Sequence, residues 1–283
     1  MDDTYRILLP TDFSDTADHA LNIGVALSKR SYSQIHLLHI EDIPEDWVKL
    51  AENSESSLFS SAQKQLAEVK NELSNRVKLA EDNGAEVKSF LKYNKSYRAI
   101  LEHIKKNRIN LIVMGAHGRT GLKGQLIGSY TEKILHHATI PVLVTKYNDV
   151  VNDFRTMVFV SDFDPKYSAS FPTVLEAAQK ARAALDVLFI NTPNTFLETK
   201  TIHKRIDKYI SSVPKGMITK IDIVNAYRFE VGLAEYCQQQ DIDIIAMPIH
   251  HKRHSWEVLG STIEDVMYHI SLPTLGIPGH KKH

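Results

Sequence analysis

Two spacings of apolar residues alternate along this chain. Short continuous apolar runs, as in RILLP (6–10), QIHLLHI (34–40) and NLIVM (110–114), predict buried strands. Between them apolar residues recur every three or four positions, which predicts amphipathic helices. A long stripe of this kind from Leu58 to Ala80 predicts a long helix, and Gly84 can end it in a left-handed conformation. Strand and helix therefore take turns throughout.

The same order of elements occurs twice. Residues 5–40 match residues 156–190, with Asp12-Phe13 aligned on Asp162-Phe163, and later segments match in the same way. The offset between the copies falls from about 150 to about 133 residues, so the first copy carries extra residues, which we assign to a longer helix. We predict two domains, residues 1–147 and 155–279, joined by the segment YNDVVNDFR.

Strands that alternate with crossover helices are typical of a parallel sheet covered by helices on both faces. The predicted fold class is therefore α/β, with two tandem open five-stranded parallel sheets flanked by helices, in the Rossmann-like manner. Ligands of such sheets bind at the carboxyl ends of the strands, where the strand order reverses.

Composition narrows the function classes. Among 283 residues, 34 Lys and Arg balance 34 Asp and Glu, so the chain lacks the basic excess that nucleic acid or an anionic membrane attracts. No apolar stretch approaches the roughly 20 residues of a membrane span, and the N-terminal MDDTYRILLP lacks the positive charge of a signal peptide. The single cysteine, Cys237, excludes an internal disulfide and fits a half-buried structural thiol on a helix, in a reducing compartment. We expect a cytoplasmic protein that binds neither nucleic acid nor membrane.

The segment IVMGAHGRTGLKGQLIGSYTEK (112–133) is unusually rich in glycine, at positions 115, 118, 121, 124 and 128. It follows a predicted strand and precedes a helix expected to begin near Ser129. Glycines let another group approach the backbone closely, and the free N–H groups of a helix start attract anions. The pattern predicts a phosphate site, although neither the P-loop string nor G-x-G-x-x-G occurs.

What does occur is Gly115-x-x-Gly118, nine residues, then Gly128-Ser129, with LPTDFS at the end of the first strand. This combination resembles the universal stress protein family, in particular its ATP-binding branch, and the resemblance covers the whole chain as a tandem member. It implies an adenine nucleotide α-hydrolase-like fold and ATP as the bound nucleotide, with Mg²⁺ bridging the phosphates. It also implies that the final strands, PVLVT and PTLGI, pair about a two-fold axis inside one chain as a pseudo-dimer. The sequence names no protein partner and leaves a further homodimer open.

Carried over position by position, the resemblance assigns three groups of binding residues. The adenine and ribose pocket takes Asp12, its neighbours Pro10 and Thr11, and the backbone of Ile40. The walls around ribose and phosphates take Met114, Gly115, His117 and Gly118. The phosphate tail takes Gly128, Ser129, Tyr130 and Thr131.

The second copy departs from this motif. Pro248 stands where the first copy has Gly115, His251 stands where it has Gly118, and the spacing to Gly260 is one residue shorter. Proline removes an N–H and fixes φ, so this loop should not wrap phosphates in the same way. We predict one nucleotide per chain, in the first copy.

Several residues also have plainer interpretations. Asp12 fits a helix-capping residue as well as a ligand contact, Gly121 and Gly124 fit loop flexibility, and Arg119 and Lys123 fit solvated loop cations. His117 is better placed as a wall than as a base. His250 and His254 have the i, i+4 spacing of zinc ligands, but the neighbouring cations Lys252 and Arg253 favour an exposed polar loop. We predict no metal ligated by the protein.

The phosphate loop has no nucleophile–base pair beside it in sequence, so no catalytic residue is assigned. The favoured interpretation is a nucleotide-dependent regulatory binding protein with at most slow ATP hydrolysis. Two alternatives stay open: a weak ATPase, and a carrier of a small apolar ligand in the altered second copy.

Overall fold

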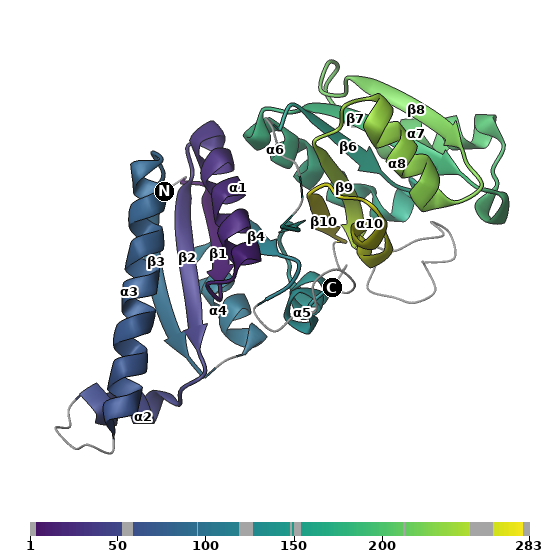
Figure 1. Ribbon diagram of the computed structural model, residues 1–283. Coiled ribbons are helices and arrows are strands. Elements are labelled where there is room, and N and C mark those ends of the chain that lie inside the picture. Colours follow the sequence, from purple (N-terminus) through teal and green to yellow (C-terminus); the bar gives the residue numbers. More distant parts are fainter. Residues whose placement is uncertain are drawn as a thin grey trace.

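A computed structural model describes residues 4–52, 59–94, 96–118, 127–147, 149, 154–211, 213–249 and 263–279. Its ten strands form a single sheet in the order β3-β2-β1-β4-β5-β10-β9-β6-β7-β8 (Figure 1). The strands are β1 Arg6–Thr11, β2 Gln34–Glu41, β3 Glu86–Tyr93, β4 Leu111–Gly115, β5 Val142–Thr145, β6 Thr156–Val160, β7 Ala184–Asn191, β8 Lys220–Asn225, β9 Ile244–Ile249 and β10 Thr274–Pro278. The α-helices are α1 Asp15–Ser31, α2 Glu45–Glu52, α3 Ser60–Asp82, α4 Tyr97–Asn107, α5 Ser129–His137, α6 Phe171–Ala181, α7 Thr199–Tyr209, α8 Phe229–Gln239 and α10 Ile263–His269, and two short 3₁₀ segments are η2 Pro165–Ser170 and η3 Pro193–Thr195.

Each half of the sheet is parallel throughout, and the halves meet at one antiparallel pair. The first half consists of β1–β5 and the second of β6–β10. At the seam Leu143 of β5 lies opposite Leu275 of β10. The predicted α/β class is confirmed, and so is the predicted pairing of the last strands within one chain. Their edges, which would otherwise be open to other chains, are covered.

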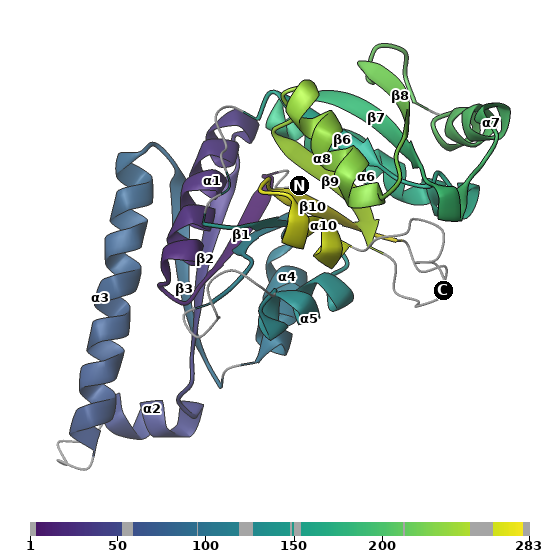
Figure 2. The same cartoon turned by 45° about the vertical axis from the view of Figure 1, so that its right-hand side comes forward.

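Helices cover both faces, and the core on each face runs through the seam. One core joins side chains of α1, α3, α6 and α7, and the other joins α4, α5, α8 and α10. In the first half, α1 and α3 lie on one side of the sheet and α4 and α5 on the other (Figure 2). The halves therefore share their apolar interior instead of touching only at an edge.

Local sequence signals account for some of the helix ends. Ser14 and Ser96 cap α1 and α4 with their hydroxyl oxygens, and Gly84 takes the expected left-handed φ of +85° after α3. α3 has 23 residues and its counterpart α7 has 11, which confirms the longer helix predicted for the first copy. Within the described part of the chain, no helix is long and apolar enough to cross a bilayer.

Two cations of the first half bind backbone carbonyls of the second. Arg30 donates from Nη1 to the carbonyls of Ala181 and Phe154, at 2.9 and 3.1 Å. Lys146, which follows β5, donates from Nζ to the carbonyls of Met267 and Ile270, both at 2.8 Å. The carbonyls of Ala181, Met267 and Ile270 lie at the C-terminal ends of α6 and α10, where cations are favoured by the helix dipole. The seam thus has charge-assisted bonds beside its strand ladder.

Cys237 lies in α8, on a helix as predicted, and it is buried where a half-buried thiol was expected. Burial raises the pKa of its thiol to about 12, so the thiolate is scarce at neutral pH. The cysteine is therefore a packing residue.

A buried histidine pair lies inside the first half. His36 on β2 and His103 on α4 approach at 3.0 Å between Nδ1 and Nε2, and both rings pack against Phe90. Burial lowers the pKa of each to about 4, and nearby positive charge, including Arg6 beside His36, acts in the same direction. Both rings are therefore neutral at pH 7.

Because these pKa values lie below that of an unfolded histidine, the unfolded chain binds more protons in acid. We expect the stability present above about pH 6.5 to fall as the pH drops toward 4, by on the order of 3 kcal/mol for each histidine of the pair. Urea unfolding at pH 7 and pH 4.5 measures this. His103→Gln should flatten the difference, whereas His203→Gln, at an exposed position of α7, should not. If both variants lost the same stability between pH 7 and pH 4.5, the pH dependence could not be assigned to the His36–His103 pair.

Candidate functional site

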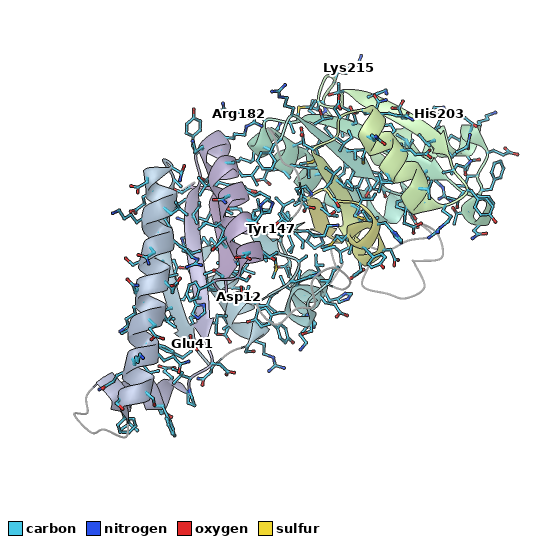
Figure 3. The ribbon with its side chains drawn as sticks, viewed as in Figure 1. Asp12, Glu41, Tyr147, Arg182, His203 and Lys215 are labelled. Atoms are coloured by element: carbon cyan, nitrogen blue, oxygen red, sulfur yellow. The ribbon has the colours of Figure 1, made fainter. Side chains whose placement is uncertain are left out.

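The candidate site lies where the strand order of the first half reverses. From β1 the chain continues to β2 and β3 on one side, then crosses back to β4 and β5 on the other, so β1 and β4 are neighbours. Their carboxyl ends, at Thr11 and Gly115, open toward the same edge of the sheet. Asp12 and Glu41 lie at this end of the first half (Figure 3). Such a switch point is where open α/β sheets bind ligands.

Asp12 organises the turn between β1 and α1. Its Oδ1 accepts from the Ser14 hydroxyl at 2.6 Å and from the Ser14 N–H at 3.2 Å. Ser14 in turn accepts from the Ala17 N–H, so the cap of α1 is Ser14. The capping interpretation of Asp12 is wrong, because Ser14 and not Asp12 is the N-cap of α1. Asp12 instead orients Ser14 by accepting its hydrogen bonds. Its second oxygen, Oδ2, lies toward the loop after β4.

The glycines after β4 are needed because other parts of the chain approach them. A Cβ on Gly115 would lie 2.7 Å from Thr16 Cγ2 and 3.1 Å from the Thr16 carbonyl oxygen of α1. A Cβ on Gly118 would lie 2.5 Å from Asp12 Oδ2. Among the described residues, only Gly84 and Gly216 are glycines with positive φ. Close packing against Thr16, and not a left-handed backbone, therefore excludes a side chain at position 115, whereas a Cβ at position 118 would have to displace the end of the Asp12 side chain.

The two ends of the glycine-rich loop are held together. The Ala116 N–H donates to the Thr145 carbonyl at 2.7 Å, and the Gly128 N–H donates to the Ala116 carbonyl at 2.8 Å. The Thr131 hydroxyl donates to the Gly115 carbonyl at 3.0 Å, so it is committed to the fold. Arg119, Gly121, Lys123 and Gly124 lie outside the described residues.

The helix after this loop begins at Ser129, as predicted, with Gly128 as its N-cap. The first N–H groups of a helix have no partner within it, and Gly128 supplies no side chain to cap them. Ser129 is exposed beside them. This helix start has the donors and the dipole that an anion needs.

Two polar side chains near the loop have buried atoms without a partner among the described residues: His117 Nδ1 and the Tyr130 hydroxyl. Burial lowers the pKa of His117, with a further contribution from the charge of Lys146, so the ring is uncharged at neutral pH. Burial raises the pKa of Tyr130 to about 12. A neutral His117 fits the wall interpretation better than that of a cationic phosphate ligand.

The structure joins five of the predicted site residues by direct contacts and places four others on the strands beside them. Asp12, Gly115, Gly118, Gly128 and Thr131 are joined by the contacts above. Pro10, Thr11 and Ile40 end the adjacent strands β1 and β2, while Met114 is buried in the core beside them. The contact of Thr16 with Gly115 was not predicted, and the i, i+4 pattern of α1 carries no signal for it.

The second half repeats the turn but differs where its fourth strand ends. Asp162 Oδ1 accepts from the Asp164 N–H at 3.2 Å, as Asp12 does from Ser14, and Phe163 has φ of 51° where Phe13 has 63°. In contrast, Pro248 and Ile249 continue as strand β9, and a Cβ on Gly276 would lie 2.6 Å from Ile249 Cδ1. Ile263, in the place of Thr131, is buried in the same core. Aliphatic packing thus occupies this part of the second half.

The zinc interpretation receives no support from the part of the chain that is described, where no group of three or more His, Cys, Asp or Glu could hold a metal ion. His250, His251, His254 and Gly260 lie outside that part. His269 of α10 packs its ring against that of the neighbouring Tyr268.

Fold and candidate site together define a tandem α/β protein whose halves share the turn after the first strand and differ where the fourth strand ends. The model of the universal stress protein family matches residues 4–146, about half of the chain. The chain belongs to the universal stress protein family.

Individual universal stress proteins are also similar to this chain. Universal stress protein MJ0577 of Methanocaldococcus jannaschii is 33% identical over 155 residues, covering 50% of this chain and 94% of the relative. Universal stress protein YxiE of Bacillus subtilis is 26% identical over 151 residues, covering 50% and 98%. A universal stress protein from Archaeoglobus fulgidus has the same fold over 98% of this chain and all of its own, with a TM-score of 0.70 and 18% identity. The last likeness extends the shared fold to both halves.

The two glycines should respond differently to alanine. Gly115→Ala places a methyl group against the backbone of α1, which should cost about 1–3 kcal/mol. Gly118→Ala meets only the movable end of the Asp12 side chain, so its cost should be within about 0.5 kcal/mol. Thermal and urea unfolding of both variants measure this. If both variants were destabilised equally, the close approach of Thr16 would not be what restricts position 115 to glycine.

Proposed function

We propose that the first half binds one molecule of ATP, with Mg²⁺ bridging the phosphates, and that the second half binds none. The bound state then regulates which surface the protein presents to its partners. One observation carries this proposal: the Asp12 carboxylate and the glycine-rich loop meet at the β1–β4 switch point, through Gly118. The spacing Gly115-x-x-Gly118, nine residues, Gly128-Ser129 resembles the ATP-binding branch of the family.

Each part of the nucleotide has a chemically suitable neighbour in this arrangement. The Asp12 carboxylate suits ribose hydroxyls, which are hydrogen-bond donors. The start of α5, with an exposed Ser129 and no side-chain cap, suits phosphate oxygens. Because the Thr131 hydroxyl donates to Gly115, we expect Thr131 to contribute through its N–H instead. Mg²⁺, when bound with ATP, would neutralise phosphate charge.

The second half supports a single site per chain. It keeps the Asp162 turn, but Ile249 and Ile263 are buried where the first half has Ala116 and Thr131. An aliphatic surface offers phosphate no donors, and burying a charged group there is costly. The carrier alternative gains nothing from the neighbouring aromatic cluster, in which Phe159, Phe163 and Phe171 are already fully buried.

Nucleotide binding suffices for a regulatory protein. A ligand shifts a conformational equilibrium if it binds one state better than the other, without any chemical step. We therefore favour a binding protein over an ATPase. Steady-state hydrolysis above about 1 s⁻¹, the low end of typical enzymes, would reverse this preference.

Titration calorimetry with Mg²⁺-ATP should give one site per chain. Asp12→Asn keeps an oxygen acceptor for Ser14 but removes the charge beside Gly118, so ATP affinity should fall about tenfold or more. Asp162→Asn makes the same change in the matching turn of the second half and should leave affinity unaltered.

Three results would contradict the proposal. These are two equivalent sites, equal loss of affinity in both variants, and no ATP binding by the wild-type chain. Heat denaturation of the purified protein followed by identification of the released small molecule provides an independent check.

A further inference from the structure

A small cavity lies at the seam between the two halves, on the face of the sheet that α1 and α6 cover. Its volume is about 30 Å³, and it is partly open to solvent. Leu143 of β5 and Leu275 of β10, which lie opposite each other in the antiparallel pair, both line it. Leu27 of α1 and Ala177 of α6 line it from the helix side, where the two helices are neighbours (Figure 1). Both halves of the chain therefore contribute to the cavity.

The internal repeat indicates why space is left at this place. Leu27 and Ala177 stand at equivalent positions of the two copies, and so do Ser31 and Ala181. In each pair the second copy has the smaller side chain. The gap between α1 and α6 is therefore lined by short side chains on the side of α6.

The walls of the cavity are largely apolar. Ile7 and Met157 line it together with the leucines. The Ser31 hydroxyl already bonds to the Leu27 carbonyl at 2.8 Å. Such a cavity stays dry because water finds too few partners in it, and a cavity of about 150 Å³ is known to admit benzene. A volume of about 30 Å³ admits the end of a linear alkyl chain but not a ring.

Lys180 of α6 brings a positive charge to the same cavity. Its Nζ lies 4.9 Å from the centre of the Tyr5 ring, and both residues line the cavity. Within the described part of the chain, Lys180 has this ring as its neighbour and no hydrogen bond or ion pair. Glu176, one turn earlier on α6, is exposed and forms no ion pair with it. The N–H donors of the ammonium group are therefore available to an acceptor.

The equivalent cation of the first copy has a different contact. Arg30 stands at the position of Lys180 in the repeat, and it donates to the carbonyls of Ala181 and Phe154. Arg30 thus already supplies a cation to the C-terminal end of α6, where the helix dipole favours one. Lys180 does not repeat this contact on α1. Holding the helix ends together is therefore the role of Arg30, and Lys180 is left facing the cavity.

We propose that this cavity binds a short-chain monocarboxylate, with its alkyl end between α1 and α6 and its carboxylate on Lys180. The alkyl end gains by leaving water for an apolar cavity. The carboxylate stays on the side that is open to solvent, so it keeps part of its hydration. Its contact with the ammonium group is a charge-assisted hydrogen bond.

The cavity is separate from the proposed ATP site. Leu111 and Ile244, which begin β4 and β9, line it. The proposed ATP site lies at the other end of the strands, beyond Gly115. Binding at one place therefore does not depend on binding at the other.

Methyl NMR of the full chain, titrated with sodium butanoate against sodium chloride as reference, tests the proposal. The methyl signals of Leu143 and Leu275 should shift saturably, with a dissociation constant on the order of 1 mM because few carbons are buried. 1-Butanol carries the same chain without the charge and should bind more weakly. Cyclohexanecarboxylate should give no saturable shift, because its ring exceeds the cavity.

Lys180→Met separates the role of the charge from that of packing. The methionine keeps an apolar stem and removes the ammonium group, so butanoate affinity should fall about tenfold while 1-butanol affinity is unchanged. Lys204→Met removes an exposed lysine of α7 and should change neither affinity. Equal loss of both ligands in Lys180→Met would overturn the carboxylate contact.

Ala177→Val fills the cavity and tests its position. Butanoate and 1-butanol should both stop binding, and the melting temperature should be unchanged or higher because free space is filled. Unchanged binding in this variant would overturn the site, as would the absence of saturable shifts in the wild type up to about 20 mM butanoate. If Ala177→Val does not fold, the comparison of the two ligands in Lys180→Met still decides.

Discussion

The antiparallel pairing of β5 with β10 is the interaction on which the rest of this molecule depends. It comprises three residue pairs, centred on Leu143 and Leu275, yet it turns two five-stranded units into one sheet with a continuous core on each face. The glycine-rich loop depends on the same strand, because the Ala116 N–H bonds to the Thr145 carbonyl at the end of β5. The next residue, Lys146, bonds to the end of α10. The seam thus supports one wall of the candidate site.

The internal repeat makes the two halves of the chain directly comparable. The turn after the first strand is retained in both halves, since Asp12 and Asp162 accept equivalent hydrogen bonds. The surroundings differ in polarity: Gly115 is replaced by Pro248, Thr131 by Ile263 and His39 by Phe189. Phe189 and Ile263 pack into the cores, and Pro248 has no backbone N–H to donate. The second half is apolar at these positions and packs into the shared cores. The first half has polar groups there that the second half folds without.

The charged groups of the first half form one connected arrangement beside the candidate site. Arg76 links α3 to α1 and to the turn, while the His39–Glu41 pair links β2 to the carbonyl of Thr11. Arg76, His39 and Glu41 are largely buried, whereas Asp18 and Glu72 are partly exposed.

The sequence by itself determined the repeat, the alternation of strand and helix, the longer α3 and the helix start at Ser129, because each follows from local periodicity or from glycine and capping chemistry. The resemblance to the family supplied the seam between the last strands and the candidate residues. Only the tertiary structure decided why Gly115 and Gly118 lack side chains, since Thr16 and Asp12 approach them from another element. It also decided that Ser14 caps α1 and that His39 faces two acceptors. These are contacts between β1, β2, β4 and α1, and no pattern along the chain encodes which atoms meet when parallel strands bring their ends together.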